Sequence, residues 1–434
     1  MNLSGTFQKL KTDFHSSFWV ANFMELFERL AYYGQATILS IFLRDHLKFT
    51  EVQAGQLSSI FGGLIYLLPI FAGALADKFG FKKAFSFAFF VLAVGYFFIG
   101  STGMKLFSGL YSNFNIYWLL TIILILTAIG GSFIKPSVLG TIALSSTNES
   151  KSFGYAIYYW LVNTGAAIGP LLAFLVRDSI GIEFVYLISS ISCALMFIST
   201  LIFYKEPPAK INEKREDIKT VIKNLFLVIR NFRFMAFLLI FALYWILFWQ
   251  FFIIIPFYIS DYISPNAPIE IIISTGAWTI ILFQIPINRL TKNISTQKAI
   301  LIGFILAAFA WLVWFIVLPL TQNTNINLFG NKIALGIPLI MLGIFLFSIG
   351  EQTQAPRFYE YVADLAPKGQ AALFQGFSFL PIAIAWGIGG TFGGWLYHTF
   401  TKELHKPEFI FLIIFVIGVI STLLMWVYNK FIIK

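Results

Sequence analysis

The chain has 434 residues, 58% of them hydrophobic and only 12% charged, and its mean hydropathy is +0.81. One soluble domain cannot bury so many apolar side chains, so the composition excludes a soluble enzyme and indicates an integral membrane protein. The formal net charge of +10 is spread over alternate loops, which argues against a nucleic-acid partner.

Twelve membrane-spanning helices are predicted from apolar runs of about 20 residues. In chain order they cover residues 17–43, 55–77, 84–103, 116–141, 153–176, 183–204, 234–260, 268–290, 298–320, 335–362, 369–397 and 408–431. The polar interruption at residues 205–233 carries eight Lys and Arg and has apolar residues at helical spacing, so we expect a cytoplasmic linker with an amphipathic surface helix. The sequence therefore predicts an all-α protein with a six-helix half at residues 1–204, the linker, and a second six-helix half at residues 234–434.

The basic residues also predict the topology. Of the 30 Lys and Arg, 20 lie in the N-terminus, the C-terminus and alternate loops, and seven lie in loops on the opposite side. Because cytoplasmic loops are enriched in Lys and Arg, we expect both termini in the cytoplasm. We expect no cleaved signal peptide before the first span. The expected location is the plasma membrane, which in a bacterium is the inner membrane.

Two six-helix halves joined by a charged linker are typical of a two-repeat secondary transporter with its binding site at mid-membrane. Small residues recur at Gly165–Pro170 and Gly389–Gly394, where helices would approach closely. These residues are equally compatible with simple helix packing.

The first predicted helix carries Glu25, Glu28 and Arg29 within about one and a half turns. An ionised side chain at the centre of a spanning helix costs roughly 2.5–3.5 kcal/mol, so such residues usually mark an ion or substrate pathway. Arg29 can hydrogen-bond either carboxylate, and Lys135 of the fourth helix would make the set near neutral if it reaches the same cavity. We expect these four residues to couple proton movement to transport, with Arg29 and Lys135 also holding a substrate anion. A static network that only fixes helix positions is the alternative.

Residues Gly73–Lys83 closely resemble the loop signature of the major facilitator superfamily. The resemblance implies twelve helices, both termini inside the cell and alternating access by rocking of two halves. Asp77 in this loop can accept a hydrogen bond from a neighbouring helix N-terminus, which suggests a role in conformational gating.

Within that superfamily the chain resembles the proton-dependent oligopeptide transporters over most of its length. Five matching segments occur in order: Glu25–Gly34, Tyr66–Pro69, Gly130–Pro136, Tyr158–Gly165 and Gly350–Pro356. Three features depart from the family pattern. Ala36 stands where peptide-transporting members often carry a second arginine, and Trp249 stands where an acid is common. The linker is also too short for the extra helix pair that many bacterial members carry. The resemblance therefore indicates the family more firmly than the substrate.

Glu351 lies about fifteen residues into an apolar span, and by resemblance it would receive a substrate ammonium group. Arg357 is better placed for Glu360 at i+3 than for Glu351, and we expect the pair at the cytoplasmic end to take part in gating. Further substrate-binding candidates, each of which has a simple packing role as its alternative, are Tyr33, Tyr66, Asn163, Trp245 and Gln250.

The sequence thus predicts a monomeric proton-coupled symporter that imports short peptides or peptide-like zwitterions, driven by the proton gradient and embedded in the lipid bilayer. The single Cys193 and four histidines outside the spans give no disulfide framework, thiolate metal site or intramembrane haem ligation, so no metal, cofactor or enzyme activity is expected. One alternative is a drug or metabolite exporter, because Gly165 and Gly169-Pro170 partly resemble an antiporter signature. Others are a carrier of another small organic anion, and a channel.

Overall fold

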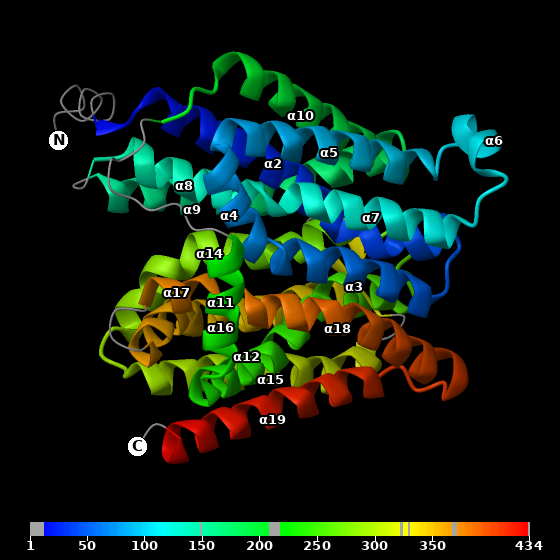
Figure 1. The fold of residues 1–434 in the computed structure, drawn as a ribbon. Helices are drawn as coiled ribbons and strands as arrows, with labels where there is room; N and C mark the ends of the chain where they lie inside the picture. Colours follow the sequence, from blue (N-terminus) through cyan, green and yellow to red (C-terminus); the bar gives the residue numbers. More distant parts are fainter. Residues whose placement is uncertain are drawn as a thin grey trace. The chain divides into compact units, whose positions relative to one another are not determined.

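The computed structural model describes residues 13–147, 150–207, 218–321, 324–328, 330–366 and 371–432, and helices form nearly all of its regular structure (Figure 1). The longer helices up to the predicted linker are α2 (Ser16–Ile41), α3 (Glu51–Leu67), α4 (Pro69–Phe79), α5 (Phe81–Ser101), α7 (Ile116–Ser132), α8 (Ile134–Ser145), α9 (Lys151–Ser179) and α10 (Ile182–Phe203). The longer helices that follow are α11 (Ile218–Ile229), α12 (Phe232–Trp249), α14 (Ile269–Thr291), α15 (Thr296–Val317), α16 (Gly336–Leu365), α18 (Leu380–His398) and α19 (Phe409–Phe431).

Shorter helical segments connect or extend these helices. They are η1 (Phe42–His46), η2 (Lys105–Phe107), α6 (Ser108–Tyr111), η3 (Gln250–Phe252), α13 (Ile254–Tyr258), η4 (Ile259–Ile263), η5 (Leu318–Thr321), α17 (Ala371–Gly376) and η6 (Thr399–Glu403).

The chain forms two compact units. The first comprises the described residues within Met1–Gln35 and Leu64–Lys223, and the second those within Ala36–Gly63 and Asn224–Lys434. Three helices cross this division. Helix α2 enters the second unit after Gln35, α3 leaves it before Leu64, and α11 enters it after Lys223. Helix ends from the N-terminal part of the sequence are therefore packed with the C-terminal helices. The predicted boundaries at the linker stay a prediction.

In the first unit, α5 packs along α7 and α10, and α4 packs against α8. Two prolines interrupt apolar runs of the first unit. Pro69 begins α4, which is bent by 47° relative to α3. Pro136 follows the break between α7 and α8, since proline lacks an N–H and clashes with the carbonyl four residues earlier. This break lies next to Lys135.

In the second unit, α15 packs along α16 and α19, and α12 packs against α18 and α19. The segment Phe232–Ile263 is the most buried of the candidate membrane spans. The first two turns of α3 meet α18 so closely that a Cβ on Gly55 would lie 2.2 Å from the carbonyl oxygen of Gly390. The small residues predicted to form close seams therefore form one here.

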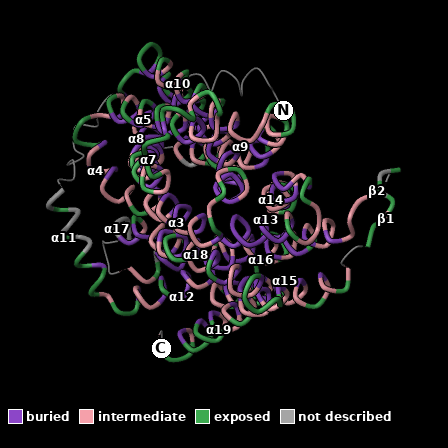
Figure 2. The backbone as a smooth tube through the Cα atoms, turned by 90° about the vertical axis from the view of Figure 1, so that its right-hand side faces the viewer, coloured by how far each residue is buried: buried purple, intermediate pink, exposed green. Residues whose placement is uncertain are grey.

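Ten described helical segments are long and apolar enough to cross a membrane, or eleven if α3 and α4 form one bent span. Helix α2 is 26 residues long but carries the three charges in its middle. The expected twelve spans and cytoplasmic termini stay predictions. Exposed apolar residues recur at three- and four-residue intervals along α10, which is green on one side in Figure 2, as a lipid-facing stripe would be: Ile188, Ile191, Leu195, Ile198 and Ile202.

Two local features complete the fold. Strands β1 (Asn325–Leu328) and β2 (Asn331–Ala334) form an antiparallel hairpin that departs from the all-α prediction. Gly330 in its turn has a φ of 84°, the left-handed region that glycine adopts most easily. Helix α11 lies where the linker helix is predicted, whereas residues 208–217 of that linker lie outside the described part of the chain.

Candidate functional site

The charged residues of α2 are buried within the first unit. Glu25, Glu28 and Arg29 are 0%, 1% and 4% exposed. The Arg29 guanidinium donates to the Glu28 carboxylate through two nitrogens, and its Nε lies 3.4 Å from Oε1 of Glu25. One base thus serves two acids, as the helical spacing predicts. The remaining oxygen of Glu28 has no hydrogen-bond partner among the described residues, so this acid is incompletely satisfied.

Lys135 belongs to the same cluster. It lies at the start of α8, and its ammonium is close enough to Glu25, Glu28 and Arg29 to interact with each electrostatically. Its Nζ also lies 5.2 Å from the ring centroid of Tyr66. Lys135 therefore reaches the α2 charges, and the set contains two acids and two bases. Near-neutral composition is what makes such burial tolerable.

Tyrosines surround Arg29. Its Cζ lies 4.8 Å from the ring centroid of Tyr32 and 5.9 Å from that of Tyr33, distances at which a guanidinium is attracted to the ring face. Tyr33 and Tyr66 were predicted in this site, and both lie beside the charges. Tyr32 was not predicted. Its signal in the sequence is the i+3 spacing from Arg29, which places the two on neighbouring parts of the helix surface.

Helix α9 packs closely against α2 at two glycines. A Cβ on Gly165 would lie 2.5 Å from the Arg29 Cβ, and one on Gly169 would lie 2.6 Å from the Leu30 carbonyl oxygen. The Asn163 amide nitrogen donates to the Tyr159 carbonyl of its own helix at 2.8 Å, which is a local bond. Tyr158, to which no role was assigned, interacts electrostatically with Glu25 and Arg29. The close contact between α9 and α2 therefore holds the backbone of α2 in place at Arg29.

Glu351 lies in the second unit, on α16, with intermediate exposure. Among the described residues no charged or hydrogen-bonding side chain engages its carboxylate, and Tyr244 of α12 lies within its electrostatic range. Neighbouring Gln352 donates to the Thr279 carbonyl of α14 at 3.2 Å, which fixes this turn of α16. An acid without a basic partner in an apolar helix can bind a cation or a proton.

The aromatic residues predicted on α12 form a packed layer. Trp249 stacks on Trp386 of α18, with ring centroids 3.7 Å apart and planes 15° apart. Trp245 packs edge-on against Tyr244 and Phe248. The Gln250 amide donates to the Gly389 carbonyl at 3.0 Å and so ties α12 to α18. Gln250 is therefore placed as a bridge between helices, with its side chain 0% exposed.

The predicted gating residues lie at helix ends. Arg357 pairs with Glu360 at 2.9 Å, as the i+3 spacing predicts, and also donates to the Thr291 carbonyl of α14. Asp77 is exposed in the last turn of α4. The backbone N–H groups of Phe81 and Lys82, in the first turn of α5, donate to the Glu206 carboxylate at 2.7 and 2.9 Å.

Glu206 was not predicted to have this capping role. Its sequence signal is a lone acid directly after an apolar span, which is too weak to identify a partner 125 residues away.

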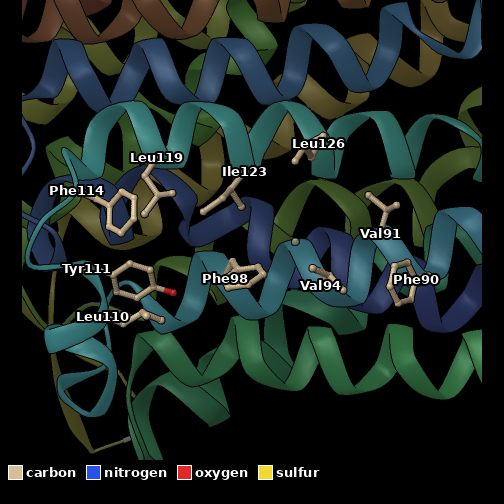
Figure 3. Close-up of a pocket in the computed structure, with 11 residues that line it drawn as sticks. Phe90, Val91, Val94, Phe98, Leu110, Tyr111, Phe114, Leu119, Ile123 and Leu126 are labelled. Carbon is tan, nitrogen blue, oxygen red and sulfur yellow. The ribbon is translucent and has the colours of Figure 1, made fainter.

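An apolar cavity of about 440 Å³ lies elsewhere in the first unit, between α5, α6 and α7 (Figure 3). Its lining includes Phe90, Phe98, Tyr111, Phe114 and Ile123, and none of the predicted site residues. Figure 3 shows the aromatic rings of Tyr111 and Phe114 at one end of this cavity. The side chains fit hydrocarbon and offer little to a charged ligand. In the described ranges, no three His, Cys, Asp or Glu side chains are arranged to hold a metal ion.

Comparison with known proteins identifies the family to which this chain belongs. The family model described as Major Facilitator Superfamily matches residues 21–264 and 262–430. The chain is 22% identical over 405 residues to "Multidrug resistance protein MdtH" of Escherichia coli O9:H4 (strain HS), covering 92% of this chain and 91% of the relative. It is 26% identical over 360 residues to MdtH of Proteus mirabilis (strain HI4320), covering 82% and 80%.

Solved structures share the fold at low identity. A POT family transporter in complex with 5-aminolevulinic acid has a TM-score of 0.74 and 19% identity, with 96% of each chain covered. A POT family transporter with a thioalcohol conjugated peptide has a TM-score of 0.73 and 18% identity, again with 96% of each covered. The nucleoside transporter NupG, as a mutant, has a TM-score of 0.73 and 15% identity, with 95% and 99% covered. With its multi-pass helices and a family model matched along nearly its whole length, the chain belongs to the major facilitator superfamily.

Proposed function

We propose that this superfamily transporter is a proton-coupled symporter that imports short peptides or peptide-like zwitterions by alternating access. The observation that carries the proposal is the cluster of Glu25, Glu28, Arg29 and Lys135, in which one guanidinium is shared between two buried carboxylates. Protonating a carboxylate in such a set releases its basic partner to bind an anion. The same set thereby links a proton to a substrate carboxylate.

Each unit carries charge suited to one end of a zwitterion. The first unit offers Arg29 and Lys135 to a carboxylate, and tyrosine rings line the same region. The second offers Glu351, which has no basic partner among the described residues, to an ammonium group. Inward movement of one positive charge is worth about 2.3 kcal/mol per 100 mV of membrane potential, which supplies the driving force. No resident cofactor is proposed, and the setting is the bacterial inner membrane.

The fold comparison supports this proposal, because two of the similar structures are POT family transporters with a peptide conjugate or 5-aminolevulinic acid bound. The similarity to MdtH favours a second candidate, export of drug-like molecules. The buried acid and base pairs suit either direction of proton-coupled transport. Glu351 favours a cargo that carries a positive charge, and Arg29 with Lys135 favours one that also carries a negative charge.

Uptake by purified protein in proteoliposomes tests the proposal. Labelled di- and tripeptides are presented outside, with an inward proton gradient or with none. We expect accumulation above equilibrium only with the gradient, and competition by unlabelled peptides. Absence of peptide competition would move the proposal to another small organic anion. Proton-driven movement of drug-like cargo in the outward direction, without peptide uptake, would replace it with export.

A further inference from the structure

The apolar cavity of the first unit is a groove that follows the contact between α5 and α7, two candidate membrane spans, and we call it the α5–α7 groove. On α5 its lining residues recur on one face from Phe90 to Phe98, which is about 12 Å of helix. On α7 they are Leu119, Ile123 and Leu126, each about one turn from the next. Figure 3 shows the two rows side by side along their helices. The groove therefore extends in the direction that crosses the membrane.

The inner wall of the groove forms where α5 and α7 touch. Gly95 lines the groove and is buried, and a Cβ on it would lie 2.1 Å from Oγ1 of Thr127. A Cβ on Gly130 would likewise lie 2.8 Å from the Cβ of Val91. The Thr127 hydroxyl donates to the Ile123 carbonyl of its own helix at 2.7 Å, so its proton is already used. The close contact therefore closes the groove on its inner side with apolar surface.

The segment formed by η2 and α6 closes one end of the groove. Tyr111 lies at this end, and its hydroxyl shares a 2.5 Å hydrogen bond with Ser101 at the end of α5 (Figure 3). Phe107 of the same segment packs edge-on against Phe97 of α5, with ring centroids 5.6 Å apart. These two contacts attach the segment to α5. The phenolic oxygen of Tyr111 is used within the protein, so its ring presents apolar surface to the groove.

The side of the groove opposite the inner wall is open. Its rim consists of exposed residues, which are Phe90, Val94, Phe98, Leu110, Phe114 and Leu126. Because α5 and α7 are candidate membrane spans, this open side faces hydrocarbon in a bilayer. The volume of about 440 Å³ is that of a ligand site, yet sites for polar ligands carry polar groups that orient the ligand. No lining residue is charged, so the groove suits a hydrocarbon ligand.

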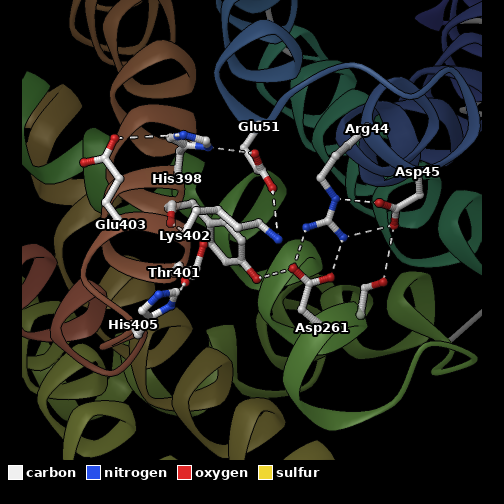
Figure 4. Close-up of polar contacts among 11 residues, drawn as sticks. Arg44, Asp45, Glu51, Asp261, His398, Thr401, Lys402, Glu403 and His405 are labelled. Carbon is white, nitrogen blue, oxygen red and sulfur yellow. Dashed lines mark hydrogen bonds and ion pairs between the residues drawn. The ribbon is translucent and has the colours of Figure 1, made fainter.

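The connection beside the closed end carries one charge. Within residues 102–115 only Lys105 is basic or acidic, its side chain is exposed, and it makes no ion pair with the described residues. The next residue, Leu106, is 85% exposed. Connections of the second unit instead hold their charges in ion pairs, such as the 2.9 Å pair of Arg44 with Asp261 (Figure 4). An unpaired base beside exposed apolar residues at the end of a span is typical of a segment that lies in the membrane interface and attracts acidic headgroups.

We propose that the α5–α7 groove binds one acyl chain of an acidic phospholipid, whose phosphate lies at Lys105. With the predicted cytoplasmic termini, this lipid belongs to the outer leaflet. Lipid tails are as apolar as the groove, so preference over bulk lipid comes from packing on several sides and from the headgroup charge. The inference goes beyond the proposed symport, because it involves neither the α2 charges nor the cargo.

Native mass spectrometry of the full-length protein tests this proposal. Protein stripped of lipid in detergent is titrated with phosphatidylglycerol or with phosphatidylethanolamine of the same acyl chains, and the Kd of the first bound lipid is measured. We expect phosphatidylglycerol to bind about fivefold more tightly, as one lysine near an acidic headgroup allows. Equal affinities for the two lipids would overturn the assignment to an acidic phospholipid.

Two matched pairs of variants locate the site. Leu126→Trp fills the groove, whereas Leu195→Trp places the same ring on α10, outside the groove, at a residue of similar exposure, 55% against 52%. Leu126→Trp should weaken binding of the first phosphatidylglycerol about tenfold, and Leu195→Trp should match the parent protein. Lys105→Gln should remove the preference for phosphatidylglycerol. Lys332→Gln, at another exposed lysine on the predicted external side, should keep it.

The same spectra distinguish other occupants of the groove. Equal affinities of Leu126→Trp and Leu195→Trp would overturn the proposal, because the bound lipid would then cover apolar surface in general. A dimer that is present in the parent protein and absent in Leu126→Trp would also overturn it, by assigning the groove to a second copy of the chain. Thermal unfolding without added lipid should give the parental midpoint for each variant. If Leu126→Trp unfolds, Lys105→Gln still tests the proposal, since it changes only an exposed side chain.

Discussion

The Nε of Arg29 lies 3.4 Å from Oε1 of Glu25, one helical turn away, with both side chains at most 5% exposed. The same guanidinium is hydrogen-bonded to Glu28. Arg29 therefore has two acidic partners, and a change in the protonation of one acid changes how strongly it holds the other.

Replacing Gly165 by alanine should destabilise the protein and disturb Arg29. The new Cβ would lie 2.5 Å from the Arg29 Cβ, and this contact cannot relax without moving α2 or α9. Overpacking of this kind costs about 1–3 kcal/mol. Thermal unfolding in detergent should show a lower midpoint. Gly109→Ala is the control, since no heavy atom lies within 4 Å of its added Cβ. Equal unfolding midpoints for Gly165→Ala and Gly109→Ala would contradict the close contact between α2 and α9.

Replacing Glu206 by alanine should loosen the start of α5. The carboxylate accepts the backbone N–H groups of Phe81 and Lys82, and loss of a helix cap costs about 0.5–2 kcal/mol. The lower end is expected, because Glu206 is exposed. Hydrogen exchange of the first turn of α5 should accelerate in Glu206→Ala and stay unchanged in Lys205→Ala. Unchanged protection in both variants would show that the cap is not formed in solution.

Glu351→Gln should weaken the binding of cargo that carries an ammonium group. The carboxylate has no basic partner among the described residues, so its charge is available to a ligand. We expect KM for a dipeptide to rise about tenfold, which corresponds to roughly 1.4 kcal/mol. For an N-acetylated dipeptide, which lacks the ammonium group, KM should be the same in the variant and in the parent protein. Asp364→Asn, an exposed acid on the same helix, serves as the control. Equal KM ratios for both cargoes would remove Glu351 from the ammonium site.

Local regularities explain what the sequence predicts well. Apolar length placed the span at residues 268–290, and α14 runs from Ile269 to Thr291. Helical spacing brought Arg29 together with Glu25 and Glu28, because those contacts lie within two turns. The i+3 pair of Arg357 and Glu360 follows the same rule. Such contacts need no knowledge of how distant segments fold.

Contacts between distant segments were not predictable from spacing. Trp249 was noted as a departure from a family pattern, yet its stacking on Trp386 depends on how α12 meets α18. The bidentate pair of Arg44 and Asp261 joins residues 217 positions apart. Gln250 illustrates the same limit, because its amide bonds the Gly389 carbonyl, a partner that no local pattern specifies. A polar residue in an apolar run signals that a partner exists without saying which one.

Proton-driven uptake by Glu28→Gln and Glu25→Gln, compared with peptide exchange, tests proton coupling most directly. Proteoliposomes measure accumulation under an imposed inward proton gradient, and counterflow exchange measures binding and alternation without one. Asp178→Asn, an exposed acid outside the cluster, is the control. We expect at least one glutamine variant to retain exchange while losing gradient-driven accumulation and its pH dependence. Parental accumulation rates and pH dependence in both variants would contradict the proposed role of the buried α2 charges.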